Sequence, residues 1–184
     1  MLKRLLLTII MTSAFCGVVS AQRWSVGTNV AEWANLGTVN AEGSVAVGRH
    51  ATVGVGFRYN PWRFGEDDQR LQNKQRTAYI YGRWWPWNVY SGWWVGVKGQ
   101  AEEYNQGGIF RRSTEEGDAY GLGVSAGYNL MLHKHLNLDM GIGGWGGYTR
   151  YVVYGCPTCG RVEGGGSKWF LMPDEIILSL VYIF

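Results

Sequence analysis

The chain has 184 residues, a length typical of one domain. Its formal net charge is +3, and removing the two charges of Lys3 and Arg4 near the N-terminus leaves +1. A charge this small provides no basic surface of the kind that binds nucleic acid, so we expect no nucleic-acid partner.

Residues 1–21 have the parts of a secretory signal peptide. Lys3 and Arg4 give a positive start, the stretch 5–19 is apolar, and small residues precede a cleavage point. The apolar stretch is shorter than the roughly 20 residues that a membrane-spanning helix needs. We therefore predict a signal peptide over 1–21 and a mature β-structured domain over 22–184.

The mature sequence predicts strands and no amphipathic helix. Eight predicted strands cover residues 24–33, 39–47, 52–59, 76–85, 92–104, 120–132, 136–150 and 176–184. Three connections are short, at Gly48–His50, Pro86–Tyr90 and His133–His135, and the other four are longer and polar or glycine-rich. Short periplasmic turns and longer outer loops are typical of outer-membrane barrels, and an even strand number leaves both termini in the periplasm.

The alternation of side chains is clearest in the strand over 120–132. One face carries Tyr120, Leu122, Val124 and Leu130, and the other carries mostly glycine and serine. Because side chains alternate between the faces of a strand, one face is apolar and the other nearly bare. We predict that the apolar face contacts lipid and the bare face lines a crowded interior.

These patterns predict an all-β fold, an eight-stranded antiparallel up-and-down transmembrane β-barrel. A secreted, glycine-rich β-sandwich is the alternative.

Six aromatic residues cluster around the short connection that follows residue 85. They are Trp84, Trp85, Trp87, Tyr90, Trp93 and Trp94. Trp and Tyr rings favour the headgroup level of a membrane, where an apolar ring meets water at its polar end. We predict a periplasmic aromatic girdle, with a soluble aromatic core as the alternative.

Six charged residues fall on the predicted inner faces of the strands. They are Glu42, Arg58, Arg83, Lys98, Glu102 and Asp139. An eight-stranded barrel is just wide enough for side chains to fill it, and unpaired buried charges are costly. We predict a structural plug of paired charges, and a gated pore lined by exchangeable ion pairs is the alternative.

Cys156 and Cys159 are the cysteines of the mature chain, and an exported protein favours a disulfide between them. A redox role or a zinc site is less favoured, since a zinc site needs two more ligands. We expect no metal site and no cofactor.

The three histidines, His50, His133 and His135, all fall in predicted periplasmic turns. An outward-facing enzyme that modifies lipid A would need a histidine or a similar base near the outer rim. We therefore expect the protein not to be an enzyme.

Several separated motifs resemble one known family. They are Tyr59-Asn60-Pro61-Trp62, Glu103-Tyr104-Asn105 with Gly107-Gly108-Ile109, the strand from Tyr120 to Tyr128, and Tyr154-Gly155-Cys156-x-x-Cys159-Gly160. The family comprises small outer-membrane barrels of Bacteroides-like bacteria, similar to OmpA and OmpX, and is catalogued as a domain of unknown function. Some members are encoded near fimbrial assembly genes, which implies surface or adhesion biology. We expect no peptidoglycan-binding domain after the barrel, unlike in larger OmpA-like proteins.

We expect a non-enzymatic protein of the bacterial outer membrane with a structural or surface-interaction role, related to adhesion or fimbriae. Any contact surface is expected in the long loops 61–73, 106–116 and 154–168. The alternatives are a narrow gated channel or a barrel that binds a small ligand, and then a lipid A-modifying enzyme. The expected partners are outer-membrane lipids and lipopolysaccharide, the barrel-assembly machinery during insertion, and fimbrial or other surface proteins.

Overall fold

The computed structural model describes residues 23–65, 71–107, 113–155 and 160–184. The predicted signal peptide lies outside the described residues. The described part contains nine strands and one short helix. They are β1 (Trp24–Asn29), α2 (Val30–Trp33), β2 (Val39–Ala46), β3 (Ala51–Asn60), β4 (Arg63–Phe64), β5 (Leu71–Trp84), β6 (Gly92–Gly107), β7 (Thr114–His133), β8 (Leu136–Tyr154) and β9 (Val162–Ile183).

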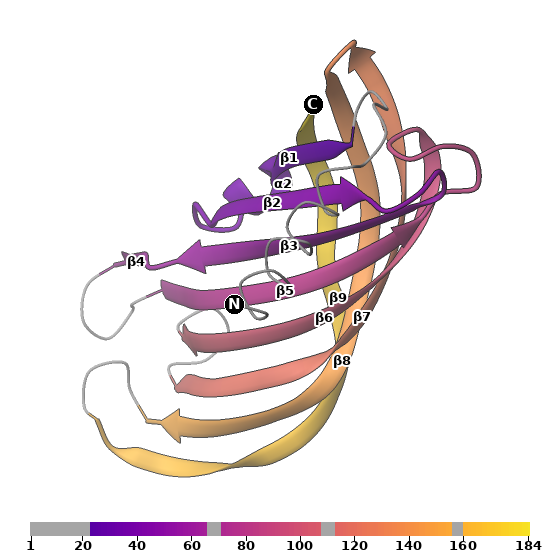
Figure 1. Cartoon of the computed structure of the whole chain (residues 1–184). Helices are drawn as coiled ribbons and strands as arrows, with labels where there is room; N and C mark the ends of the chain where they lie inside the picture. Colours follow the sequence, from indigo (N-terminus) through magenta and orange to yellow (C-terminus); the bar gives the residue numbers. More distant parts are fainter. Residues whose placement is uncertain (1–22, 66–70, 108–112, 156–159) are drawn as a thin grey trace, which may run out of the picture.

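All strand pairings are antiparallel, and the strands form a single sheet (Figure 1). The order is β3-β2-β1-β9-β8-β7-β6-β5-β4, and β3 also pairs with β5, so eight strands close a ring and β4 is a two-residue addition. This arrangement confirms the prediction of eight antiparallel strands that pair in chain order. The helix α2 has four residues, and no described helix meets the length and hydropathy of a membrane crossing.

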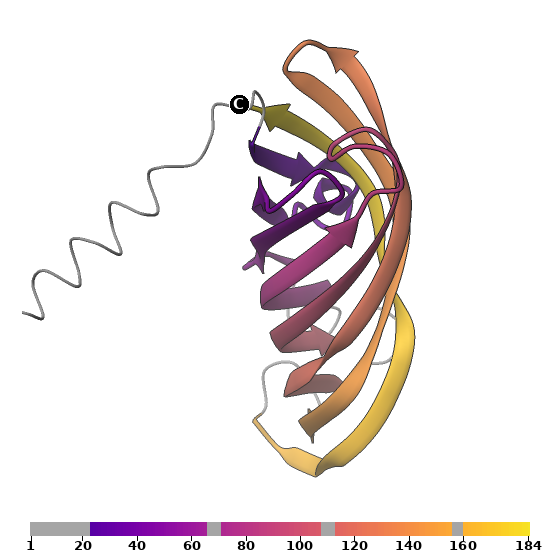
Figure 2. The ribbon, with the colours of Figure 1, turned by 45° about the vertical axis from the view of Figure 1, so that its right-hand side comes forward.

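The wall of the ring is uneven in height. The first strand, β1, has 6 residues, whereas β9 has 22, and β1 pairs with β9 only between Ser179 and Ile183. The β7–β8 hairpin rises beyond the C-terminus in Figure 2. The ring is therefore short along β1 to β3 and tall along β7 to β9.

The first strand ends earlier than the pattern over 24–33 predicted. The side-chain oxygen of Asn29 accepts a hydrogen bond from the Ala31 N–H at 3.1 Å, which caps α2. The side-chain nitrogen of Asn29 donates to the Ile176 carbonyl at 3.0 Å on β9. Asn therefore offers the backbone local partners in place of the strand ladder, and the prediction is wrong for residues 30–33.

Three strands begin five or more residues earlier than predicted. They are β5, which begins at Leu71, β7, which begins at Thr114, and β9, which begins at Val162. The predicted loop over 154–168 is therefore wrong for its last seven residues. There Gly164, Gly165 and Gly166 pair with β8 through their backbones. Glycines carry no side chains that could show a strand alternation, which is why this sequence reads as a loop.

The two faces of the sheet reverse the usual pattern of a soluble protein. The side chains of Leu122 and Val124 are 75% and 66% exposed, and Tyr120 and Leu130 are also exposed on the outer face. Inside, most of the buried described residues are polar or charged, and Asp139 is fully buried. In this protein the apolar side chains therefore face outward and the polar side chains face inward.

Glycines on the inner face leave room for long side chains of neighbouring strands. A Cβ atom at Gly123 would lie 2.8 Å from Lys98 Cε, and one at Gly56 would lie 2.3 Å from the Tyr79 ring. Inner glycines also allow close backbone packing, since a Cβ at Gly147 would lie 2.0 Å from the Tyr120 carbonyl oxygen. The interior is thus filled by large side chains that pack against glycines of neighbouring strands.

We expect Gly147→Ala to destabilise the protein by about 1–3 kcal/mol, the usual cost of overpacking, because its new Cβ meets rigid backbone. Gly164→Ala is the matched control, since no heavy atom lies within 4 Å of its added Cβ. Equilibrium chemical unfolding followed by tryptophan fluorescence measures both variants. Equal unfolding free energies for the two variants would contradict close packing at Gly147.

Candidate functional site

The polar interior of the ring is the candidate site, and Asp139 on β8 is its most deeply buried charge. One carboxylate oxygen of Asp139 accepts a hydrogen bond from Arg83 Nη1 at 2.7 Å, and the other accepts one from Trp94 Nε1 at 2.7 Å. The Arg83 guanidinium lies 4.2 Å from the centre of the Trp94 ring and 3.7 Å from a carboxylate oxygen of Glu42. These residues form a first charge cluster, called the lower cluster because it lies nearer the short turns. It joins β2, β5, β6 and β8.

An upper cluster surrounds Arg58 and Lys98. Arg58 Nε lies 2.8 Å from Glu32 Oε1, and its other nitrogens pair with Asp174 and Glu175. Lys98 Nζ also pairs with Asp174, and it lies 3.1 Å from Glu175 Oε1. Two cations thus share three carboxylates across the interior.

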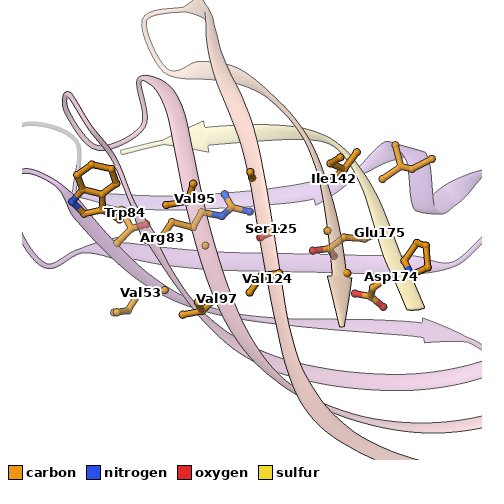
Figure 3. A pocket seen from close by; sticks show the side chains of 18 of the residues that line it. Val53, Arg83, Trp84, Val95, Val97, Val124, Ser125, Ile142, Asp174 and Glu175 are labelled. Carbon is orange, nitrogen blue, oxygen red and sulfur yellow. The ribbon is translucent and has the colours of Figure 1, made fainter. Parts of the chain in front are cut away.

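Asp174 and Glu175 follow each other in sequence but both face inward, because β9 bulges at Asp174, between Pro173 and Glu175. Gly143 pairs with Glu175 and Gly144 pairs with Pro173, so Asp174 is the extra residue. Figure 3 shows the Asp174 and Glu175 side chains near each other, with Ser125 between them and the Arg83 side chain in this view. A bulge turns a side chain away from the regular alternation.

Sequence reasoning missed Asp174, Glu175 and Glu32. The predicted last strand began after the two acidic residues, and Glu32 was placed in a regular strand. A proline within a strand is a sign of a bulge, so Pro173 is the signal that could have revealed the first two. No comparable sequence signal marks Glu32, because its position follows from α2 folding against β9.

Glu32 lies on α2, in the connection between β1 and β2. Burial raises the pKa of its carboxyl to about 7, and the positive charge of Arg58 opposes this shift. One oxygen of Glu32 has no hydrogen-bond partner among the described residues. Glu32 is therefore a buried acid whose charged form is disfavoured by burial and favoured by Arg58.

The structure brings together five of the six predicted lumen charges in ion pairs, and Glu102 is the exception. Its carboxylate accepts a hydrogen bond from Gln100 Nε2 at 3.2 Å. Within the described ranges it forms no ion pair. Glu102 therefore depends on a neutral amide, whereas the other five are paired with opposite charges.

The girdle prediction is wrong for Trp85, Tyr90 and Trp94. They are 0%, 6% and 1% exposed and pack inside the ring in a cluster with Ile177, Val181 and Ile183. Neighbouring strand residues face opposite sides, so Trp84 and Trp85 cannot both point outward, nor can Trp93 and Trp94. Trp84, Trp87 and Trp93 are the members that are exposed.

This inner aromatic cluster closes one end of the interior, at the side of the short turns. Trp85 Nε1 donates to Thr52 Oγ1 at 3.2 Å, and the Tyr90 hydroxyl lies 3.1 Å from the Ser44 hydroxyl. The polar ends of the rings are thus satisfied while their apolar parts pack together.

Little free space remains between the two charge clusters. One cavity of about 20 Å³ is lined by Glu32, Glu42 and Glu175 with Tyr79 and Ser125 among its neighbours. That volume suits about one water molecule.

Other predicted candidates can be placed in part. His50 Nδ1 lies 3.0 Å from the Trp85 carbonyl oxygen and His135 Nδ1 lies 2.9 Å from that of Ile183, so both rings contact backbone at the short turns. Within the described ranges no three His, Cys, Asp or Glu side chains are arranged to hold a metal ion. Cys156 and Cys159 lie outside the described residues.

The geometry defines an all-β protein with an apolar exterior and a charged, filled interior. The chain belongs to the family described as "Protein of unknown function (DUF3575)", whose model matches residues 6–184. No curated protein and no solved structure matches the chain.

Asp139→Asn is expected to destabilise the protein by about 3–5 kcal/mol, because it leaves the Arg83 charge buried with only the more distant Glu42. Glu103→Gln is the control, since Glu103 forms an exposed pair with Arg76 at 3.9 Å that is worth less than about 1 kcal/mol. Chemical unfolding gives both values. A similar small loss in the two variants would show that the Asp139 pair does not hold the interior together.

Proposed function

We propose that this protein is an eight-stranded transmembrane β-barrel of the bacterial outer membrane, with both termini in the periplasm. The observation that carries the proposal is the reversed burial. Exposed Leu, Val, Ile and Trp side chains cover the outer face, and charged and amide side chains fill the inner face. A large exposed apolar surface requires an apolar surrounding, and a lipid bilayer provides one.

The height of the apolar surface supports this proposal. A row of outward charges crosses four strands in register, from Arg76 to Glu103, Asp118 and Arg150. Below this row on β7, outward apolar side chains run from Tyr120 to Leu130. The ten residue-to-residue steps from Tyr120 to Leu130, at about 3.3 Å each on strands tilted by about 40°, span about 25 Å, which matches the apolar band of outer-membrane barrels.

The filled interior favours a structural or surface-interaction role over a channel. The two charge clusters and the inner aromatic cluster occupy the space that an aqueous pore would need. Eight strands enclose an interior only wide enough for side chains. The described residues above the charged row are the surface that we propose for contacts with other surface proteins, and these residues include the exposed start of β9, Val162–Lys168.

Lipids and lipopolysaccharide would surround the outer face, and the barrel-assembly machinery would insert the chain. The expected absence of enzymatic activity stays a prediction, as does a fimbrial or adhesive context.

Val124→Arg tests the membrane proposal. Val124 lies near the middle of the apolar band, where an outward Arg costs about 2–4 kcal/mol in a bilayer. In a protein surrounded by water, the same surface change would cost less than about 0.5 kcal/mol. The measurement is the free energy of unfolding of protein that has been refolded into lipid vesicles.

Glu116→Arg is the matched control, because Glu116 lies on the same strand, is exposed and lies beyond the charged row. Its cost is expected to stay below about 1 kcal/mol. Equal costs for Val124→Arg and Glu116→Arg would sink the membrane placement.

Purified protein in a planar lipid bilayer is expected to leave the conductance at baseline, because ion pairs and aromatic rings fill the interior. The conductance of the Arg58→Ala variant, which lacks the partner of three carboxylates, is measured in the same way for comparison. Steady conductance of the unmodified protein would overturn the closed interior and favour the channel alternative.

A further inference from the structure

The charges of the interior do not balance. Three cations, Arg58, Arg83 and Lys98, face six carboxylates within the described ranges. The carboxylates belong to Glu32, Glu42, Glu102, Asp139, Asp174 and Glu175. If all six are ionised, three negative charges are in excess, and protonation of Glu32 still leaves two. A buried charge without a partner is costly, so the excess requires compensation.

The excess is most evident at Glu102, since the three cations contact other carboxylates. Thr77 on β5 is the register partner of Glu102 on β6, and Gln100 lies two residues away on the same inner face. Thr77 and Gln100 are only 4% and 5% exposed. Thr77 Oγ1 and Gln100 Oε1 have no hydrogen-bond partner among the described residues.

Gln100 lies beside the Glu102 carboxylate on the same inner face. Its Nε2 donates to Glu102 Oε2 at 3.2 Å, and a half-turn of the amide group would put the unpartnered oxygen in the place of this nitrogen. A proton on Glu102 could satisfy one acceptor only. With the Gln100 amide rotated in this way, a bound cation could contact one oxygen from each of the three side chains.

We propose that Glu102, Gln100 and Thr77 form a binding site for a hard divalent cation of the calcium type. Calcium accepts carboxylate, side-chain carbonyl and water oxygens in flexible geometry, whereas magnesium requires stricter geometry and keeps more waters. The mixed set of one carboxylate, one amide and one hydroxyl matches this preference. The site is independent of the proposed membrane placement, because it depends only on groups inside the ring.

The test uses the refolded full mature chain at neutral pH, with cations first removed by a chelator. Its thermal unfolding midpoint is then measured against CaCl₂ concentration at constant ionic strength, with MgCl₂ as a parallel series. The midpoint of the unmodified protein is expected to rise with calcium and to saturate, because a ligand that binds only the folded state stabilises it. Magnesium is expected to act only at higher concentration.

Glu102→Gln should raise the calcium concentration of the half-maximal effect by more than about tenfold, since even groups around the ligands of a metal contribute about 10- to 100-fold. Glu103→Gln is the matched control, because the neighbouring Glu103 faces outward and is exposed. Its calcium response should equal that of the unmodified protein. Thr77→Val provides a second, uncharged variant with a weaker calcium response if Glu102→Gln does not fold.

Two results would overturn the site. In the first, the unfolding midpoint of the unmodified protein does not respond to calcium but changes with pH, and the midpoint of Glu102→Gln responds to neither. This result would show that a proton compensates the charge of Glu102. A calcium response that is the same in Glu102→Gln and Glu103→Gln would place the bound cation on another part of the molecule.

Discussion

The fold depends on the pairing of charges inside a closed ring of strands. Arg58, Arg83 and Lys98 connect carboxylates on strands that lie far apart in the sequence, including β2, β8 and β9. Opposite charges and hydrogen bonds surround these groups, which offsets part of the cost of burying them. The ring closes around this network, and the outer face is therefore left to carry the apolar side chains.

Filling the interior also requires that large side chains lie opposite glycines. Glycines of β3 and β7 lie under Tyr79 and Lys98, and the ring can be narrow because these positions have no Cβ. The inner aromatic cluster completes the closure at the end with short turns. Together the charges, rings and glycines fill the ring, which fits the proposed structural or surface-contact role better than transport.

The strand alternation in the sequence predicted much of this arrangement. It placed Tyr120, Leu122, Val124 and Leu130 on the outer face and Arg58, Arg83, Lys98 and Asp139 inside, because a period of two is a local property of a strand. The same rule, applied strictly, would have placed Trp85 and Trp94 inside as well. Their clustering near one turn suggested a girdle, and strand alternation overrode that preference for the headgroup level.

By itself the sequence determined the eight strands of the ring, the short turns and the two faces, since these follow from spacing between nearby residues. Only the tertiary structure decided which charges meet, because ion pairs join residues from strands that are distant in the chain. The bulge at Asp174 turned two consecutive carboxylates inward, and Asn29 ended β1 so that α2 could bring Glu32 to Arg58. These changes turned an expected balance of three positive and three negative charges into an excess of carboxylates.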